Sequence, residues 1–324
     1  MNQPTDRPIP IIVDTDLGED IDDMLVLAFA LNSPEFDVLA VTTVDGDTDA
    51  RSRIARRTVA AFGQAQIPVV AGYYRMMPFP NDPWPPLTAV HQNDVAPAEA
   101  GLPPRCQTPA DELIAKIAAD RPGEVTVCTI GAMTNLGYAL LKFPETVENL
   151  KGVVTNGGNF DLQDHCAIGW NLRYDPVAAG IVARSGVSWT LLSESTSGSE
   201  ASGVPIGPSA EDVAAIAEAG LETTDIMWTA IQGWRKNKIE ARNRPGALPH
   251  VSDLNTMACL LGGFIETQPA FVEVGVGARG RLPSLKVDPD PEGPHQVGCR
   301  VTPGRGRPLH DLLMERLLAR PGGA

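Results

Sequence analysis

The sequence predicts an α/β protein, in which one large domain (1–324) holds a mostly parallel β-sheet covered by helices. The first observation is a regular alternation of short apolar runs, rich in β-branched residues, with longer segments of helical periodicity. The second is the composition, because 43% hydrophobic and 20% charged residues are typical of a globular protein. The third is the lack of an internal repeat or an abrupt change of composition that would mark a domain boundary.

Each predicted strand is an apolar run of a length typical of strands. Before residue 194 these runs lie at 9–13, 36–44, 67–72, 124–130, 152–155 and 187–193. Helices are predicted between them at 24–31, 49–63, 109–119, 135–141 and 176–184. Towards the C-terminus we expect short strands at 271–276 and 296–301 and a final helix at 309–318.

Two segments break this alternation. A proline-rich stretch at about 73–107 is predicted to be a long surface loop. Loops of that length are unusual unless they serve a function, for example as a lid. A stretch at about 209–239 is predicted to be a helical insertion.

The charge and the cysteines limit the partners and the compartment. A net charge of −14, from 26 Lys and Arg against 40 Asp and Glu, repels polyanions, so we expect no nucleic-acid partner. No apolar stretch approaches the roughly 18 residues of a membrane helix, and the N-terminus does not resemble a signal peptide. The five cysteines are scattered and odd in number, which is typical of free thiols in a reducing compartment. We therefore expect a cytoplasmic protein with no membrane partner.

An acidic cluster follows the first predicted strand and precedes a helix. It consists of six carboxylates in ten residues: Asp14, Asp16, Glu19, Asp20, Asp22 and Asp23. Helix capping explains one or two of them, and Asp20 is a suitable N-cap. The others repel one another and need a counter-charge, and open α/β sheets bind ligands at such strand ends. The cluster therefore predicts a hard divalent cation bound by oxygen ligands.

A strand followed by Asp-x-Asp is found in two kinds of enzyme. One is the haloacid dehalogenase-like phosphatase, whose first Asp is a nucleophile, but that pattern has no role for the pair Asp22-Asp23. The other is the nucleoside hydrolase, and DTDLGEDIDD (14–23) closely resembles that family's signature DTDxGxDxDD. Further segments similar to the family follow in the right order: LAVTTVDGD (39–47), TIGAMTN (129–135), VVTNGG (153–158), WNLRYDPVAA (170–179) and HVSDLNTMA (250–258).

The resemblance implies a nucleoside hydrolase-like fold and a metal-dependent reaction. The expected reaction is hydrolysis of the N-glycosidic bond of a ribonucleoside or a modified nucleoside, giving free base and ribose or a ribose derivative. One Ca²⁺ ion is expected to bind the 2′- and 3′-hydroxyls of the ribose. The implied ligands of this ion are Asp16, Asp23, Asp253 and the backbone carbonyl of Ile130. The alternative is a member of the same fold that binds a ribosyl ligand with little or no catalysis.

The resemblance also implies roles for the residues around the metal. Asp22 matches the general base that deprotonates the attacking water, and His250 is a candidate for protonating the leaving base. The residues assigned to substrate binding are Asp14, Asp47, Asn159, Gln163, Trp170 and Asn171. Asp14 is further expected to hold Asp16 and the metal in position without binding the metal itself. Asn135 is expected to cap the helix that begins at this residue. A homodimer or homotetramer is expected.

Three positions depart from the family pattern. Asp47 stands where the family usually has an Asn that contacts the ribose, and two residues separate His250 from Asp253. Gly169 stands where the family carries a Glu that binds the 5′-hydroxyl. The sequence therefore predicts a conserved type of metal site with an altered substrate pocket. We expect room at Gly169 for a modified 5′ group, covered by the proline-rich loop, and common nucleosides as poor substrates.

Overall fold

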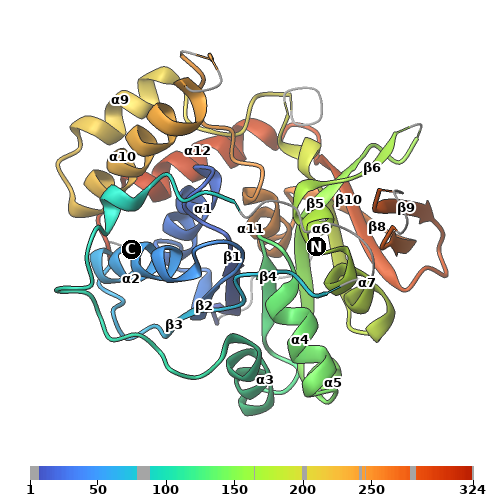
Figure 1. Cartoon of the computed structure of the whole chain (residues 1–324). Helices are drawn as coiled ribbons and strands as arrows, with labels where there is room; N and C mark the ends of the chain where they lie inside the picture. The colour runs from blue at the N-terminus through green and yellow to red at the C-terminus, as the bar shows by residue number, and fades with distance from the viewer. Residues whose placement is uncertain are drawn as a thin grey trace.

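The computed structural model describes residues 7–78, 88–163, 165–198, 203–240, 243–244, 246–277 and 282–322. Within these residues the chain forms one ten-stranded sheet with helices on both faces (Figure 1). The strand order is β3-β2-β1-β4-β5-β7-β10-β8-β9, and β6 pairs with β5 outside this path. The predicted α/β fold with a mostly parallel sheet is therefore confirmed.

Seven neighbouring strands run parallel, and β1 lies among them where the order of the chain reverses. From β1 the chain adds β2 and β3 on one side and then returns to add β4, β5 and β7 on the other. Such a reversal leaves a crevice at the carboxyl ends of the strands, where α/β proteins bind ligands. These strands are β1 (Ile9–Thr15), β2 (Phe36–Thr43), β3 (Val69–Ala71), β4 (Thr126–Thr129), β5 (Gly152–Phe160), β7 (Trp189–Ser193) and β10 (His295–Val301).

The remaining strands are antiparallel to their neighbours. They are β6 (Cys166–Ile168), β8 (Ile265–Gly275) and β9 (Ser284–Pro289). The predicted strand at 271–276 is the second half of β8, whereas β6 and β9 were not predicted. β6 has only three residues, none of them fully buried, and Leu285 is the one buried residue of β9, so neither strand contains a buried apolar run of the usual length.

Alternate residues of β1 enter two different hydrophobic cores, because neighbouring side chains of a strand point to opposite faces. Ile11 and Val13 belong to one core and Ile12 to the other. The first core is completed by α1 (Asp22–Leu31), α2 (Thr48–Ala61), α9 (Ala210–Glu218), α10 (Glu222–Trp234), α11 (Leu254–Leu261) and α12 (Gly306–Leu318). The second is completed by α3 (Ala110–Asp120), α4 (Thr134–Lys142) and α7 (Pro176–Ser185).

Helix α1 is buried along its whole length, which explains why its sequence is apolar on every side. This burial also carries Asp22 and Asp23, its first two residues, into the interior. None of the helices in the described part of the chain is long and apolar enough to cross a membrane.

The two segments that interrupt the alternation contain further short helices. The insertion at 209–239 forms α9, α10 and the π-helical turn η3 (Arg235–Glu240). The described parts of the proline-rich loop contain η1 (Asn93–Val95), and 79–87 lies outside the described residues. The other short helices are α5 (Thr146–Asn149), α6 (Trp170–Tyr174) and η2 (Glu194–Ser197).

Candidate metal centre and active site

A pocket opens at the carboxyl ends of β1, β4, β5 and β7, four strands that are adjacent in the sheet. Each strand, or the residue that follows it, contributes to the pocket wall, and the loop before α11 closes one side. The lining residues are Asp16, Glu19, Asp20, Asp22, Asp23, Ile130, Asn156, Trp170, Asn171, Glu194, Lys238, Ser252 and Asp253.

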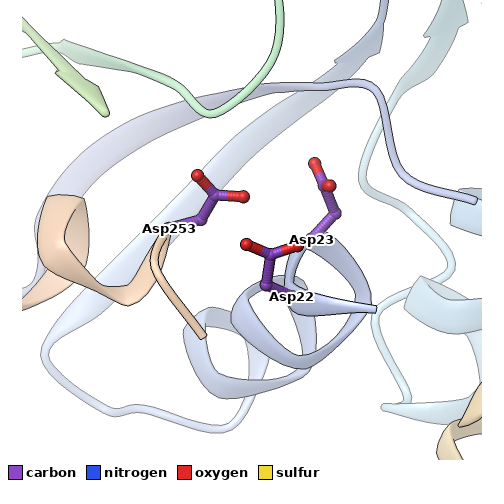
Figure 2. A group of neighbouring side chains, drawn as sticks. All are labelled: Asp22, Asp23 and Asp253. Carbon is purple, nitrogen blue, oxygen red and sulfur yellow. The ribbon is translucent and has the colours of Figure 1, made fainter. Parts of the chain in front are cut away.

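Three carboxylates converge at the bottom of this pocket. Oxygens of Asp22, Asp23 and Asp253 all lie within 4.8 Å of one another (Figure 2). Asp22 and Asp23 come from the first turn of α1, and Asp253 directly precedes α11. The fold brings together residues that lie more than two hundred positions apart in the sequence, as the resemblance predicted for Asp23 and Asp253.

Polar side chains hold each of the three carboxylates. The hydroxyl of Thr15 donates to Asp23 at 2.5 Å, and the hydroxyl of Ser252 donates to Asp22 at 2.9 Å. The amide of Asn156, on β5, donates to Asp253 at 2.9 Å. Hydrogen bonds from strands β1 and β5 and from the loop before α11 therefore hold the three carboxylates in place.

Burial makes it costly for these carboxylates to carry their charges together. Desolvation, together with the charges of neighbouring carboxylates, raises the pKa of Asp16 to about 7 and that of Asp22 to about 6. The pKa values of Asp23 and Asp253 are raised well above 3.8 by the same two causes. A cation would remove this repulsion, and carboxylate oxygens are the ligands that hard divalent cations prefer. The acidic cluster can therefore bind a metal ion.

The two other predicted ligands also reach the pocket. Asp16 follows β1, and Ile130 follows β4, so both line the same end of the sheet. Asn171 donates its side-chain amide to the carbonyls of Ile130 and Asn156, each at 2.9 Å. The bond to Ile130 fixes the position of its carbonyl. All four residues predicted to bind the metal therefore line one pocket.

Asp14 and Asn135 lie behind the pocket wall. The carboxylate of Asp14 accepts hydrogen bonds from the Thr42 hydroxyl at 2.6 Å and the Asn135 amide at 2.7 Å, and burial raises its pKa to about 7. The prediction that Asn135 caps a helix is wrong, because the N-cap of α4 is Met133. Asn135 instead ties β1 to the end of β2 and accepts from the backbone N–H of Tyr73 at 2.9 Å.

The expected N-cap role of Asp20 is also wrong. Helix α1 begins at Asp22, and its N-cap position is Ile21. The carboxylate of Asp20 instead pairs with the ammonium group of Lys238 at 2.5 Å, and Glu19 lies 3.5 Å from the same ammonium. Lys238 comes from η3, so the helical insertion supplies a cation to the acidic rim of the pocket.

The remaining predicted residues divide into two groups. Trp170 and Asn171 line the pocket. Asp47 is exposed and accepts from the backbone N–H of Ala50 at 2.9 Å as the N-cap of α2. The other residues that do not line this pocket are Asn159, Gln163 and His250, all exposed. The charge of His250 nevertheless lowers the pKa of Asp22.

Arg51 supplies a counter-charge from behind the acidic loop. Its guanidinium is fully buried and donates to the carbonyls of Asp16, Leu17 and Asp45, with 2.7 Å to each of the last two. It also donates to the hydroxyl of Thr88, which belongs to the proline-rich loop. Its charge lowers the pKa of Asp16 and of Asp23. Arg51 therefore both shapes the loop and compensates part of its charge.

We expect Arg51→Met to lower the free energy of unfolding by about 3–5 kcal/mol, because several buried carbonyls lose their donor and the buried carboxylates lose a nearby positive charge. Urea unfolding followed by circular dichroism measures this change. Arg57→Met is the matched control on the same helix, since Arg57 forms an exposed ion pair with Glu222. Its expected cost is at most about 1 kcal/mol. Equal costs for the two variants would contradict the anchoring role of Arg51.

Comparison with known proteins assigns the chain to a family. Residues 11–303 match the family described as inosine-uridine preferring nucleoside hydrolase. The chain belongs to the nucleoside hydrolase family. This membership excludes the haloacid dehalogenase-like alternative that Asp-x-Asp had left open.

The chain is similar to named nucleoside hydrolases in sequence and in fold. It is 35% identical over 189 residues to a probable uridine nucleosidase 2 of Arabidopsis thaliana, covering 54% of this chain and 56% of that protein. It is 32% identical over 197 residues to a pyrimidine-specific ribonucleoside hydrolase of Photobacterium profundum, covering 56% of this chain and 59% of that one. The matched region thus spans less than two thirds of these relatives.

Solved structures of the family share the fold over nearly the whole chain. A purine-preferring ribonucleoside hydrolase from Gardnerella vaginalis superposes with a TM-score of 0.77 at 19% identity, covering 97% of this chain and 100% of that one. A plant nucleoside hydrolase gives a TM-score of 0.74 at 22% identity, covering 96% and 99%. At these identities the likeness shows the fold.

Gly169, where the nucleoside hydrolase pattern has a Glu, does not leave an open space. A Cβ atom at position 169 would clash with a carboxylate oxygen of Glu194 and with the carbonyl of Gly157. The expectation of room for a modified 5′ group at Gly169 is therefore wrong, because Glu194 fills that place. Desolvation raises the pKa of Glu194 to about 7.

Four pocket residues were not singled out from the sequence: Asn156, Glu194, Lys238 and Ser252. Asn156 lies on β5, and Glu194 directly follows β7. Both strands were predicted, so the rule that ligands bind at the carboxyl ends of parallel strands could have identified both residues. Lys238 gives no such signal, because its position depends on how the helical insertion packs against the acidic loop.

Proposed function

We propose that this protein hydrolyses the N-glycosidic bond of a ribonucleoside or a modified nucleoside, releasing free base and ribose or a ribose derivative. The observation that carries the proposal is the convergence of Asp16, Asp22, Asp23 and Asp253 in one pocket with the Ile130 carbonyl. Membership of the nucleoside hydrolase family supports the same reaction. A homo-oligomeric state and a cytoplasmic location stay predictions.

Asp16, Asp23, Asp253 and the carbonyl of Ile130 would hold one divalent cation, which we propose is Ca²⁺. When bound, Ca²⁺ supplies two oxygen-binding positions for the vicinal hydroxyls of a ribose and acidifies water beside it. The all-oxygen donor set supports a hard cation over zinc, which prefers nitrogen and sulfur ligands. Asn171 supports the site by fixing the Ile130 carbonyl.

We assign Asp22 as the general base of the reaction. Asp22 takes a proton from water while the oxygen of that water bonds to C1′. The C1′–N bond breaks, and its electron pair leaves with the nucleobase. What supports this role is its position in the pocket, with its carboxylate within 4.8 Å of those of the proposed metal ligands Asp23 and Asp253. The hydroxyl of Ser252 donates to one oxygen of Asp22 and orients this carboxylate. His250, whose charge acts on Asp22, remains the proposed acid that protonates the leaving base.

An assay on a panel of nucleosides tests the proposed function. Purified protein is incubated with uridine, inosine, adenosine and cytidine in the presence of Ca²⁺, and free base and reducing sugar are measured. We expect base and ribose in equal amounts from at least one nucleoside. Binding of a nucleoside without release of base would favour the non-catalytic alternative, in which the fold only holds a ribosyl ligand.

A further inference from the structure

Thr88 connects two oppositely charged side chains behind the acidic loop. Its hydroxyl accepts a hydrogen bond from the guanidinium of Arg51 and donates one to the carboxylate of Asp45. All three side chains are buried, so this hydroxyl links a buried positive charge to a buried negative one. Thr88 belongs to the proline-rich loop, Arg51 lies on α2, and Asp45 lies in the turn between β2 and α2. The three residues therefore join three separate segments of the chain.

The backbone beside Asp45 is shaped to receive Thr88. Asp45 has a φ of 63°, a left-handed conformation that is uncommon for residues other than glycine. In this conformation its carboxylate also accepts from the backbone N–H of Thr88 at 3.3 Å. Gly46 follows, and a Cβ atom there would lie only 2.6 Å from the carbonyl oxygen of Thr88. Thr88 is therefore fixed on its amide, its carbonyl and its hydroxyl side.

Arg51 connects Thr88 to a predicted metal ligand. The same guanidinium donates to the carbonyl of Asp16 and, at 2.7 Å, to the carbonyl of Leu17. On its other side Asp16 lies against Gly131, where a Cβ atom would be 2.8 Å from the Asp16 nitrogen and 3.1 Å from its carboxylate. The backbone of Asp16 is thus held between Arg51 and the chain that follows β4. Because the backbone sets the direction of the Cα–Cβ bond, these contacts orient the carboxylate.

The residues that follow Thr88 extend the contact with the acidic loop. The backbone N–H groups of His91 and Gln92 both donate to the carbonyl of Gly18, at 2.6 and 3.2 Å. The side-chain amide of Gln92 also donates to the carbonyl of Asp20 at 2.5 Å. The segment 88–92 therefore contacts the acidic loop at several points along its length.

We infer that Thr88 is a positioning residue for the metal ligand Asp16, because its hydroxyl holds Arg51 in the orientation that fixes the Asp16 backbone. Removing a group that orients a metal ligand typically costs about 10–100-fold in metal affinity. The inference rests on the proposed metal site and goes beyond it, since it makes cation affinity depend on a residue of the proline-rich loop. By linkage, a bound cation in turn stabilises the contact between the segment 88–92 and the acidic loop.

Calorimetric titration with Ca²⁺ tests the inference without a substrate. Thr88→Val removes the hydroxyl and keeps the shape of the side chain, so it should raise the Kd for Ca²⁺ by about 10-fold or more. Thr88→Ser restores the hydroxyl and should bind Ca²⁺ nearly as tightly as the wild type. Ser33→Ala is the matched control, because it removes a buried hydroxyl that donates to the carbonyl of Phe29 at 2.6 Å, beyond the far end of α1. It should lower the stability and leave the Kd unchanged.

Hydrogen exchange of the wild type is a second measurement, which also decides the question if Thr88→Val does not fold. Binding of Ca²⁺ should slow the exchange of the amide hydrogens of His91 and Gln92, because their acceptor belongs to the acidic loop. The amide of Ile9 is the internal reference. It donates to the carbonyl of Glu35 at the opposite end of β1, and its exchange should stay the same.

The inference would be overturned by an unchanged Kd in Thr88→Val, by no recovery in Thr88→Ser, or by an equal loss of affinity in Ser33→Ala. Exchange at His91 and Gln92 that does not respond to Ca²⁺ would also overturn it. A protein that shows the expected Kd values but hydrolyses no nucleoside would retain the inference and lose the proposed function. One that hydrolyses nucleosides with equal Kd values in the wild type and Thr88→Val would lose only the inference. A wild type that binds no divalent cation would overturn the inference together with the proposed metal site.

Discussion

Asp22→Asn should reduce kcat by about 10²–10⁴-fold, the usual effect of removing a general base. The amide has nearly the shape of the carboxylate and can keep its contact with Ser252, but it cannot accept the proton of water. Asp22 also lies within 4.8 Å of Asp23 and Asp253, so the loss of its charge lowers the repulsion among these groups. The fold should therefore be retained or stabilised while turnover is lost. Release of free base under substrate saturation measures the effect.

Comparison with a metal-ligand variant separates the base from the metal site. Asp23→Asn should weaken metal binding and turnover together, whereas Asp22→Asn should lose turnover with the metal still bound, as measured by calorimetric titration. Asp288→Asn, at an exposed position on β9, is the control for a change of charge alone. If Asp22→Asn retained turnover within a few-fold of the wild type, the proton acceptor would have to be another residue, and Asp16 is the carboxylate that would be examined next.

The strands and helices that could be predicted from the sequence are those whose residues are buried on both sides along nearly the whole element. β1 and α1 are buried almost throughout, so their apolar runs stand out against the acidic residues between them. β9 is mostly exposed, with Leu285 buried and Val287 half-buried, and it depends on pairing with β8, its neighbour in the sheet. Helix α11 was missed for a different reason. Its eight residues include polar ones, Asn255 and Thr256, that are buried and hydrogen-bonded only in the folded protein.

The site residues that could be predicted from the sequence are those that belong to a local motif or that follow the end of a predicted strand. Asp16, Asp22 and Asp23 are fixed by one strand-to-helix turn, so their proximity follows from ten residues of sequence. Arg51 could not be recognised in the same way. It is one of four arginines between 51 and 57, and only packing shows that this one points into the core while Arg57 faces solvent.

The pair Gly169 and Glu194 shows the limit of reading a motif position by position. The sequence correctly indicates that a carboxylate is missing at 169, but it does not show that the same space is filled from 25 residues further along. Such an exchange depends on β5 and β7 being neighbours in the sheet, with α6 seated over their ends. A change in a local motif therefore predicts a change in chemistry only when the surrounding strand ends are considered together.

Removal of the metal should abolish turnover and lower the melting temperature, and the second effect should depend on pH. The folded-state pKa of Asp16 is raised to about 7 from an unfolded value of 3.8. Between these values the folded metal-free protein binds more protons than the unfolded chain, so its free energy of unfolding falls as the pH rises. A bound cation keeps the carboxylates ionised and opposes this loss. The stabilisation by metal should therefore be larger at pH 7.5 than at pH 5.

Thermal unfolding with excess EDTA or with Ca²⁺, at both pH values, measures this difference. With free Ca²⁺ at about 100 times its Kd, the expected stabilisation at pH 7.5 is about 2.7 kcal/mol. At pH 5 protons compete for the same oxygens, so both the metal affinity and the gain in melting temperature should be smaller. Asp253→Asn is the matched variant, since it removes one ligand from the cluster and should lose most of the gain at both pH values. A gain that is the same at pH 5 and pH 7.5, and unchanged in Asp253→Asn, would mean that the cation binds elsewhere on this acidic protein. Turnover that survives EDTA would contradict the metal requirement itself.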